Sequence, residues 1–240
     1  EFSGGFSVED CLFENLGGHA IHGVHRPRTE EKVKSTAYDC EPYEEPPHFS
    51  IKRTIMLDTD QNEYSRGSWG FSFDGVGRPE TPASITLQDI IADQSWPAPD
   101  SKGFYSRGVL LVESAIEASR GHAYSELLID NLDARCTISD RALLMLNHLR
   151  EGEVTNSSIV WEEGGHRFID IDRVDYDGFK GTPDSRVRFQ GNQGNALVRV
   201  RGQIVGEVNE DFTVEGGKRL PKASSSVTVH LDAEGEEVAS

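Results

Sequence analysis

The sequence predicts an all-β fold in which short strands stack as the coils of a parallel β-helix. Three observations lead to this prediction: a strand-like segment recurs, each copy is followed by a turn and a second short alternating run, and no stretch keeps an apolar 3.6-residue period over three turns. A unit of about 25 residues without a helix cannot bury its own apolar face and must stack on the next copy. We expect about six coils, with a β-sandwich as the alternative.

The first strand of each unit follows one pattern: apolar, any, apolar, polar, polar, then mostly apolar residues. Alternation with a period of two residues is typical of a strand with one buried face. The copies are FSVEDCLF (Phe6 to Phe13), FSIKRTIM (Phe49 to Met56), ITLQDIIA (Ile85 to Ala92) and LLIDNLDA (Leu127 to Ala134), with a weaker copy at EVTNSSIVW (Glu153 to Trp161).

The second strand is shorter and follows a corner marked by residue pairs such as Gly-Gly or Arg-Gly. Its copies are AIHGV at Ala20, GFSFD at Gly70, GVLLVES at Gly108, ALLMLNH at Ala142 and FIDID at Phe168. Aligning them predicts an inward column of Ile21, Phe71, Leu110, Leu144 and Ile169. The G-G-H turn recurs in VEDCLFENLGGHAIHG and VTNSSIVWEEGGHRFIDI, which favours copied coils over a sandwich.

These units divide the chain into a parallel β-helix over residues 1–215 and a linker with an acidic tail over 216–240. RVRFQGNQGNALVRVRG, Arg186 to Gly202, forms the last coil of the stack. Residues 26–47, rich in Glu, Lys and Pro, are an irregular corner insertion. The first residues contain no initiator Met and no signal segment, so we expect a fragment or a processed form.

Composition limits the function classes. The net charge is −17, with 41 acidic residues spread along the chain, as in halophilic proteins. This surface would repel phosphates, which disfavours nucleic-acid binding, and no apolar run is long enough to span a membrane. The 3 cysteines form no C-x-x-C pair, which excludes a disulfide framework and a zinc knuckle.

Three histidines at a spacing of three, His19, His22 and His25, resemble a metal site. Side chains alternate along an extended strand, so these three would not share one face. His166 repeats His19 after the second Gly-Gly pair, which favours a corner role for both. We therefore predict no metal site here.

The same alignment predicts a column of outward side chains on the second strand. Its members are His22, Ser72, Leu111 with Glu113, Met145 with Asn147, Asp170 with Asp172, and Arg199 with Arg201. Neighbouring coils are about 4.8 Å apart, so Asp170 and Asp172 would face Arg199 and Arg201. Leu111 and Met145 would need a cover, either a loop or a second chain, unless the register is shifted by one and both face the core.

The coils from Phe6 to Gly202 resemble the right-handed parallel β-helix proteins of the pectate-lyase-like superfamily, in an acidic, halophile-type variant. The resemblance implies carbohydrate contact and, for an enzyme, a polysaccharide lyase or glycoside hydrolase. In the lyases, acidic residues hold Ca²⁺ against a uronate and an Arg acts as the base. Asp170 and Asp172 would take the first role, and Arg199 and Arg201 the second. The polygalacturonase motifs are absent, which counts against a hydrolase, and the alternative for these four residues is an exposed salt-bridge ladder.

A second carbohydrate signal is the segment DQSWPAPDSKGFYSRG, which lies between two strands of one coil. Trp96 on a proline-stiffened loop, followed by Phe104 and Tyr105, could stack on a sugar ring, while the nearby Asp93, Asp100 and Arg107 could bond hydroxyl groups. We predict Trp96, Tyr105 and Arg107 as substrate-binding residues. The alternative for Trp96 is packing that anchors the loop.

Three functions remain open. The chain could be a secreted or surface β-helix that binds an acidic polysaccharide, either without cleaving it or as an enzyme that cleaves it. It could be a non-catalytic spike or adhesin of a virion or cell envelope, closed as a trimer over Leu111 and Met145. It could also be one stacking segment of a larger assembly, with an uncapped N-terminal coil.

Overall fold

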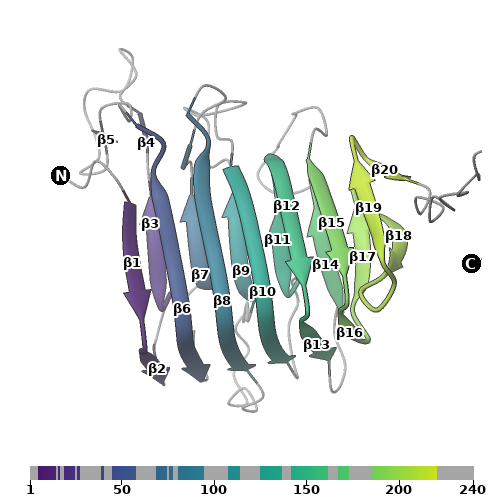
Figure 1. Cartoon of the computed structure of the whole chain (residues 1–240), viewed down its shortest axis with the longest axis horizontal. Helices are drawn as coiled ribbons and strands as arrows, with labels where there is room; N and C mark the ends of the chain where they lie inside the picture. The colour runs from purple at the N-terminus through teal and green to yellow at the C-terminus, as the bar shows by residue number, and fades with distance from the viewer. Residues whose placement is uncertain are drawn as a thin grey trace, which may run out of the picture.

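The described part of the chain is built from β-strands. The computed structural model describes residues 5–14, 16, 19–24, 26–27, 39–40, 45–57, 69–74, 76–77, 81–94, 108–113, 125–136, 142–161, 167–172 and 185–220. Strands, turns and bends make up these ranges, and none of them contains a helix (Figure 1). The same ranges therefore hold no helix that is long and apolar enough to cross a membrane. The all-β prediction is confirmed for this part of the chain.

The larger of two main sheets has 11 strands. Along its main path lie β1 (Gly5–Glu9), β6 (His48–Leu57), β8 (Ala83–Gln94), β10 (Ser125–Cys136), β12 (Leu149–Thr155), β15 (Arg186–Gln190), β19 (Phe212–Glu215) and β20 (Lys218–Leu220). Three short strands that pair beside this path complete the sheet: β2 (Leu12–Glu14), β13 (Ser158–Trp161) and β16 (Gln193–Gly194).

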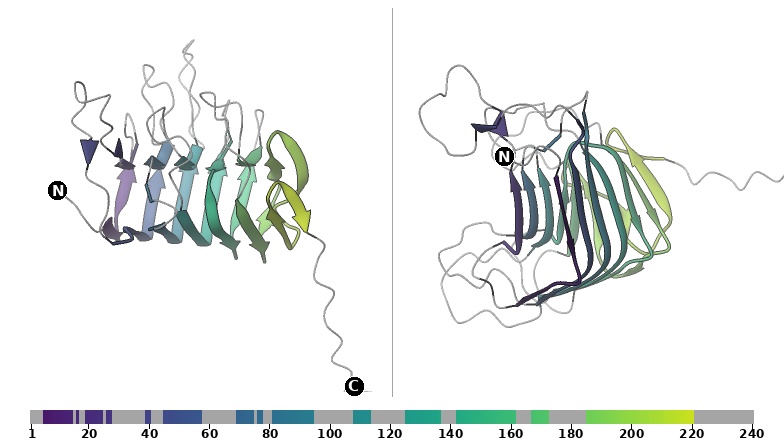
Figure 2. Two further views of the ribbon diagram at one scale, coloured as in Figure 1. Left: turned by 90° about the horizontal axis from the view of Figure 1, so that it is seen from above. Right: turned by 60° about the vertical axis from the view of Figure 1, so that its left-hand side comes forward.

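The second sheet has 7 strands, and the chain alternates between the two sheets from β6 to β12. Its strands are β3 (Ile21–Val24), β7 (Trp69–Asp74), β9 (Gly108–Glu113), β11 (Leu144–Leu146), β14 (Phe168–Ile171), β17 (Leu197–Val200) and β18 (Gln203–Glu207). Neighbours from β3 to β17 pair in parallel. The two sheets lie opposite each other, with the long strands of the larger sheet on one side (Figure 2).

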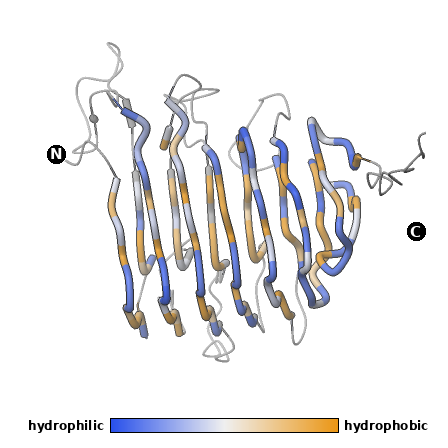
Figure 3. Tube along the Cα trace, viewed as in Figure 1, coloured by the Kyte–Doolittle hydropathy of each residue, from blue (hydrophilic) through white to orange (hydrophobic). Residues whose placement is uncertain are grey.

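The register confirms the inward column predicted from the aligned second strands. Ile21 pairs with Phe71, Phe71 with Leu110, Leu110 with Leu144 and Leu144 with Ile169. The larger sheet has an equivalent column that runs through Val8, Ile51, Leu87, Ile129, Val154 and Phe189. Apolar positions on neighbouring strands therefore lie side by side (Figure 3).

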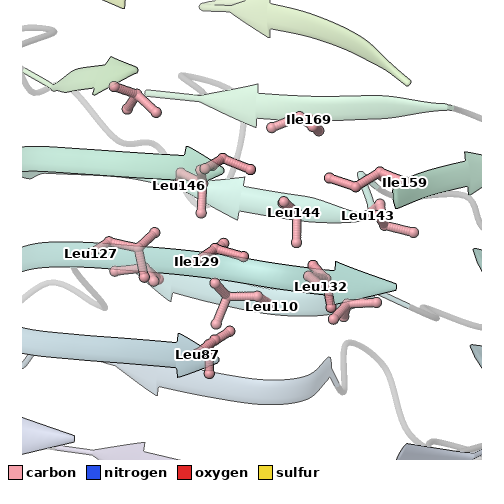
Figure 4. Close-up of a cluster of buried hydrophobic side chains, with 14 of the residues drawn as sticks. Leu87, Leu110, Leu127, Ile129, Leu132, Leu143, Leu144, Leu146, Ile159 and Ile169 are labelled. Carbon is pink, nitrogen blue, oxygen red and sulfur yellow. The ribbon is translucent and has the colours of Figure 1, made fainter. Parts of the chain in front are cut away.

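The core lies between the two sheets. Side chains from both sheets form one buried cluster, in which Leu87, Leu110, Ile129 and Leu144 are fully buried (Figure 4). Removing a Leu or Ile side chain from water stabilises the fold by about 1.5–3 kcal/mol. Each strand contributes few such residues, so this burial depends on the packing of many strands from both sheets.

The long strands of the larger sheet bend at a column of residues with positive φ. Asp10, Arg53, Asp89, Asn131 and Asn156 have φ between 46° and 57°. In β6 the buried positions before this residue are Phe49 and Ile51, and after it they are Thr54 and Met56. The left-handed residue thus shifts the inward face by one position, so that both halves of the strand line the core. Asn and Asp adopt this conformation more easily than other non-glycine residues.

The C-terminal end of the stack changes to antiparallel pairing. β19 pairs antiparallel with β15, β18 with β17, and β20 with β19. In the seven-stranded sheet, parallel pairing therefore ends at β17, shortly before Gly202. The strand β20, Lys218–Leu220, lies within residues 216–240, which the sequence analysis predicts as a linker and tail.

Part of the predicted corner insertion, residues 26–47, is described. β4 (Arg26–Pro27) and β5 (Asp39–Cys40) pair in parallel and form a separate two-stranded sheet. Residues 45–47 lead into β6, and the rest of the insertion lies outside the described residues.

Candidate functional site

The outward column of the seven-stranded sheet has the predicted register. His22 pairs with Ser72, Ser72 with Leu111, Leu111 with Met145, and Met145 with Asp170, while Arg199 pairs with Asp170. This column defines the candidate face, which is the outer face of the seven-stranded sheet.

Met145 lies on this face and not in the main core. Its neighbours Leu144 and Leu146 belong to the core cluster, whereas Met145 packs in a separate cluster with Ala142, against which Phe168 also packs. The register is therefore correct, and Met145 is 0% exposed. Atoms of this same chain cover it, so no second chain is needed to bury this side chain. For Leu111 the structure describes the backbone in β9 and not the side chain.

Asp170 and Arg199 form a bidentate ion pair on the candidate face. Arg199 Nε donates to Asp170 Oδ1 at 2.5 Å, and Nη2 donates to Oδ2 at 2.7 Å. Side-chain exposure is 1% for Asp170 and 20% for Arg199. The pair is therefore largely buried, unlike the exposed ladder that was the alternative interpretation. A pair of this geometry replaces the water that both ions lose on burial.

Phe168 supplies a third contact to the Arg199 guanidinium. The Arg199 Cζ atom lies 3.9 Å from the centroid of the Phe168 ring, within the range of a cation–π interaction. Phe168 and Asp170 are two residues apart on β14, so their side chains lie on the same face of the sheet. Asp170 and Phe168 together fix the position of the guanidinium.

Asp172 does not share the face of Asp170, contrary to the sequence expectation. It follows the end of β14, has a φ of 48° and is fully buried. The Ser185 hydroxyl donates to its Oδ1 at 2.6 Å, and the Ser185 and His148 amides donate to its carboxylate oxygens at 3.2 Å each. The left-handed conformation turns this carboxylate towards the start of β15.

Burial raises the pKa of the Asp172 carboxyl above its usual value, while the bonds from Ser185 and His148 act in the opposite direction. Ser185 Oγ also accepts a bond from the Leu149 amide at 2.9 Å. Asp172 therefore joins β14 to the starts of β12 and β15. The contact brings together Asp172 and Ser185, which are 13 positions apart in the sequence.

Arg201 occupies a turn after β17, has a φ of 48° and is exposed. Its amide donates to the Ile171 carbonyl at 3.1 Å, next to Asp172. Among the four residues predicted to form the site, Asp170 and Arg199 form a direct ion pair. The described ranges contain no group of three His, Cys, Asp or Glu side chains placed to hold a metal ion.

The predicted sugar-contacting residues Trp96, Tyr105 and Arg107 lie outside the described residues. The described strands on either side of this segment are β8, which ends at Gln94 in the larger sheet, and β9, which begins at Gly108 in the seven-stranded sheet. Their proposed role stays a prediction.

Two of the three clustered histidines are described, and they are close together. The ring centroids of His19 and His22 lie 4.5 Å apart, with a 34° angle between the planes. His19 is at the corner and His22 is on β3, so the bend at this corner brings together side chains that an extended strand would separate. His25 lies outside the described residues.

Exposed salt bridges instead occupy the outer face of the larger sheet. Arg188 contacts Glu153 at 2.8 Å and Arg186 contacts Glu151 at 3.4 Å, and all four side chains are 44–56% exposed. Exposed pairs of this kind contribute about 0–1 kcal/mol each.

Sequence reasoning missed Phe168, Ser185 and His148. Phe168 could have been found, because period-two alternation places it on the same face as Asp170. No alternation pattern could have identified Ser185, because it lies 13 positions after Asp172 and on a different strand segment. The link between His148 and Asp172 depends on two left-handed residues that no local pattern marks.

Comparisons with protein-family models, with curated proteins and with solved structures found no match to this chain.

Proposed function

We propose that this chain is a right-handed parallel β-helix of the pectate-lyase-like kind, secreted or displayed on a cell or virion surface, which binds an acidic polysaccharide along the candidate face. The order of the strands supports the β-helix. From β6 to β12 successive strands alternate between the two sheets, and from β8 to β12 each strand pairs in parallel with the strand two places earlier in the chain.

The shape of the candidate face favours an extended ligand. Equivalent side chains recur about every 4.8 Å across the strands, so the outward column from His22 to Arg199 runs at right angles to them. A ligand would meet this column at His22, which is exposed, and at Arg199, which is one-fifth exposed, because Ser72, Met145 and Asp170 are buried. These two residues lie towards opposite ends of the seven-stranded sheet, so a linear polymer could reach both and a small compact ligand only one.

The Arg199 guanidinium is the observation that carries the proposal. Asp170 accepts bonds from Nε and Nη2, and this bidentate contact holds the plane of the guanidinium. With Phe168 beneath it, the guanidinium has a fixed orientation and remains one-fifth exposed. A planar, pre-oriented guanidinium is suited to recognising a uronate carboxylate.

The charge of the chain sets the conditions for binding. At a net charge of −17, the protein repels a polyanion at low ionic strength. Salt shortens the range of this repulsion, with a Debye length of about 10 Å at 0.1 M, and calcium could bridge the two acidic partners. We expect affinity for a uronate polymer to rise with salt or calcium, the opposite of the behaviour of a basic protein.

Binding without cleavage, as in a spike or adhesin, is the second candidate and has its own support. Asp170 and Arg199 neutralise each other, so neither is set up as a proton acceptor at a sugar carbon. The Asp172 carboxylate is fully buried and bonded to Ser185, which leaves it unsuited to holding calcium against a substrate. These contacts favour recognition over catalysis.

The binding test uses affinity electrophoresis through gels containing polygalacturonate or alginate, at several salt concentrations, with and without calcium. Arg199→Lys keeps the charge but loses the planar fork, and we expect it to weaken retardation at least about tenfold. Arg188→Lys, in an exposed pair on the other sheet, is the matched control and should leave retardation unchanged. Circular dichroism checks that both variants are folded.

Failure of the wild type to bind either polymer in every condition would overturn the proposal. Absorbance of unsaturated products, followed in the same mixtures, separates the two candidates. Rising absorbance identifies a lyase, and binding without it supports the spike or adhesin.

A further inference from the structure

His19 and His22 lie at the corner that leads into β3, and their ring centroids are 4.5 Å apart. The prediction of no metal site assumed an extended chain, in which residues three positions apart point to opposite faces. Ala20 forms a bend between the two histidines, so this assumption does not hold for them. The two imidazoles are therefore close enough to be considered as one site.

The backbone between the two rings is held by the neighbouring coil. The Ala20 amide donates to the Gly70 carbonyl at 2.9 Å, and Ile21 pairs with Phe71 of β7. Ala20 and Ile21 also pack against the core. These contacts set the positions from which both imidazoles project before any ligand binds, and such pre-organisation lowers the entropic cost of binding.

The spacing of the rings fits two neighbouring positions around one metal ion. For a metal–nitrogen distance of about 2.0–2.1 Å, two imidazoles bound at a right angle have centroids about 4.5 Å apart, and two bound at the tetrahedral angle have centroids about 5.2 Å apart. The observed 4.5 Å matches the right angle, which square-planar and octahedral ions such as Cu²⁺ and Ni²⁺ favour. Neutral imidazole is also the commonest protein ligand of transition metals.

Solvent access and charge at this corner suit a hydrated cation. His22 is exposed and His19 is half-buried, so solvent reaches the pair. Within the described ranges no third His, Cys, Asp or Glu side chain joins them in a group placed to hold a metal ion, so water would fill the remaining coordination positions. The net charge of −17 raises the concentration of cations near the surface.

We propose that His19 and His22 form a two-histidine site for a divalent transition-metal ion of the Cu²⁺ or Ni²⁺ type. The site does not depend on the polysaccharide proposal, because four strands of the seven-stranded sheet lie between β3, which carries His22, and β17, which carries Arg199. Losing either ring turns a chelate into a single ligand. Each single variant should therefore lose most of the affinity that the double variant loses.

Isothermal titration calorimetry of the full chain with Cu²⁺, and separately with Ni²⁺, tests the site at neutral pH. We expect His19→Gln and His22→Gln each to raise the dissociation constant at least about tenfold, with little further loss in the double variant. His48→Gln is the matched control, because His48 is an exposed imidazole on β6 of the other sheet and its removal should leave the affinity unchanged. Circular dichroism checks that every variant is folded.

Electron paramagnetic resonance of the Cu²⁺-loaded chain adds a readout of the ligands themselves. Two imidazole nitrogens should split the signal of the wild type, and one should split that of each single variant. A wild-type chain that binds neither ion overturns the proposal. So do single variants that bind as tightly as the wild type, which would leave the pair a ring contact only, or an equal loss in His48→Gln.

Discussion

The Asp170–Arg199 pair should behave as one energetic unit. Arg199→Met keeps an unbranched side chain beside Phe168 but leaves the carboxylate of Asp170, which is 1% exposed, without its bidentate partner. Removing one partner of a buried pair costs about 3–5 kcal/mol. Because Arg199 is 20% exposed, we expect the lower end, about 3 kcal/mol, or about 6–12 °C in melting temperature for a chain of this size.

The double variant tests the reasoning most directly. Asp170→Leu combined with Arg199→Met replaces the pair by apolar side chains, next to the buried Met145. Such a replacement is often neutral, so the free energy of unfolding should return to within about 1 kcal/mol of the wild type. A coupling free energy of at least about 2 kcal/mol follows.

Urea unfolding followed by circular dichroism measures the four free energies. The same cycle at the exposed Arg188–Glu153 pair, with Arg188→Met and Glu153→Leu, should give a coupling below about 1 kcal/mol. Additive effects at Asp170 and Arg199, or equal coupling at the two pairs, would refute the assignment of a buried, mutually dependent pair.

Two further predictions concern the corners. Burial raises the pKa of the Asp172 carboxyl in the folded protein, so the folded state binds a proton at this group more tightly than the unfolded state does. Proton binding at Asp172 therefore adds to the free energy of unfolding at low pH. This contribution is lost as pH rises from the unfolded pKa of about 3.9 through the higher folded pKa. Asp172→Asn should remove this part of the pH dependence in urea unfolding, and an unchanged pH profile would contradict the assignment. Gly194→Ala should destabilise the protein more than Gly202→Ala, measured as melting temperature. Both glycines have positive φ, but a Cβ at 194 would lie 2.0 Å from the Ile159 carbonyl oxygen and one at 202 meets nothing within 4 Å. Equal losses would show that backbone conformation alone decides the cost.

The strand pairs of the core could be predicted from the sequence. Alternation in FSVEDCLF and its copies fixed which residues face inward, and aligning the copies fixed the register of Ile21, Phe71, Leu110, Leu144 and Ile169. A shift of one residue would turn every apolar side chain outwards, so register follows from local pattern. The same reasoning correctly paired Asp170 with Arg199.

The two-residue alternation does not describe the residues at which the chain leaves the strands. Asp172 and Arg201 each follow the end of a strand and adopt positive φ, so the alternation that governs residues 168–171 no longer applies to them. The partners of Asp172 are a residue of the preceding coil, His148, and one beyond an excursion of the chain, Ser185. Such contacts depend on how the corners of the fold pack, and the spacing of the residues in the sequence does not predict them.

The sequence by itself determined the all-β character and the inward columns, because each depends on a two-residue period that any single strand carries. Only the tertiary structure decided which polar side chains are buried, since burial depends on atoms that distant parts of the chain bring over a face. It also decided that the stack closes at its C-terminal end with antiparallel strands, because the direction in which a strand returns depends on the turn before it and on the surface left to cover.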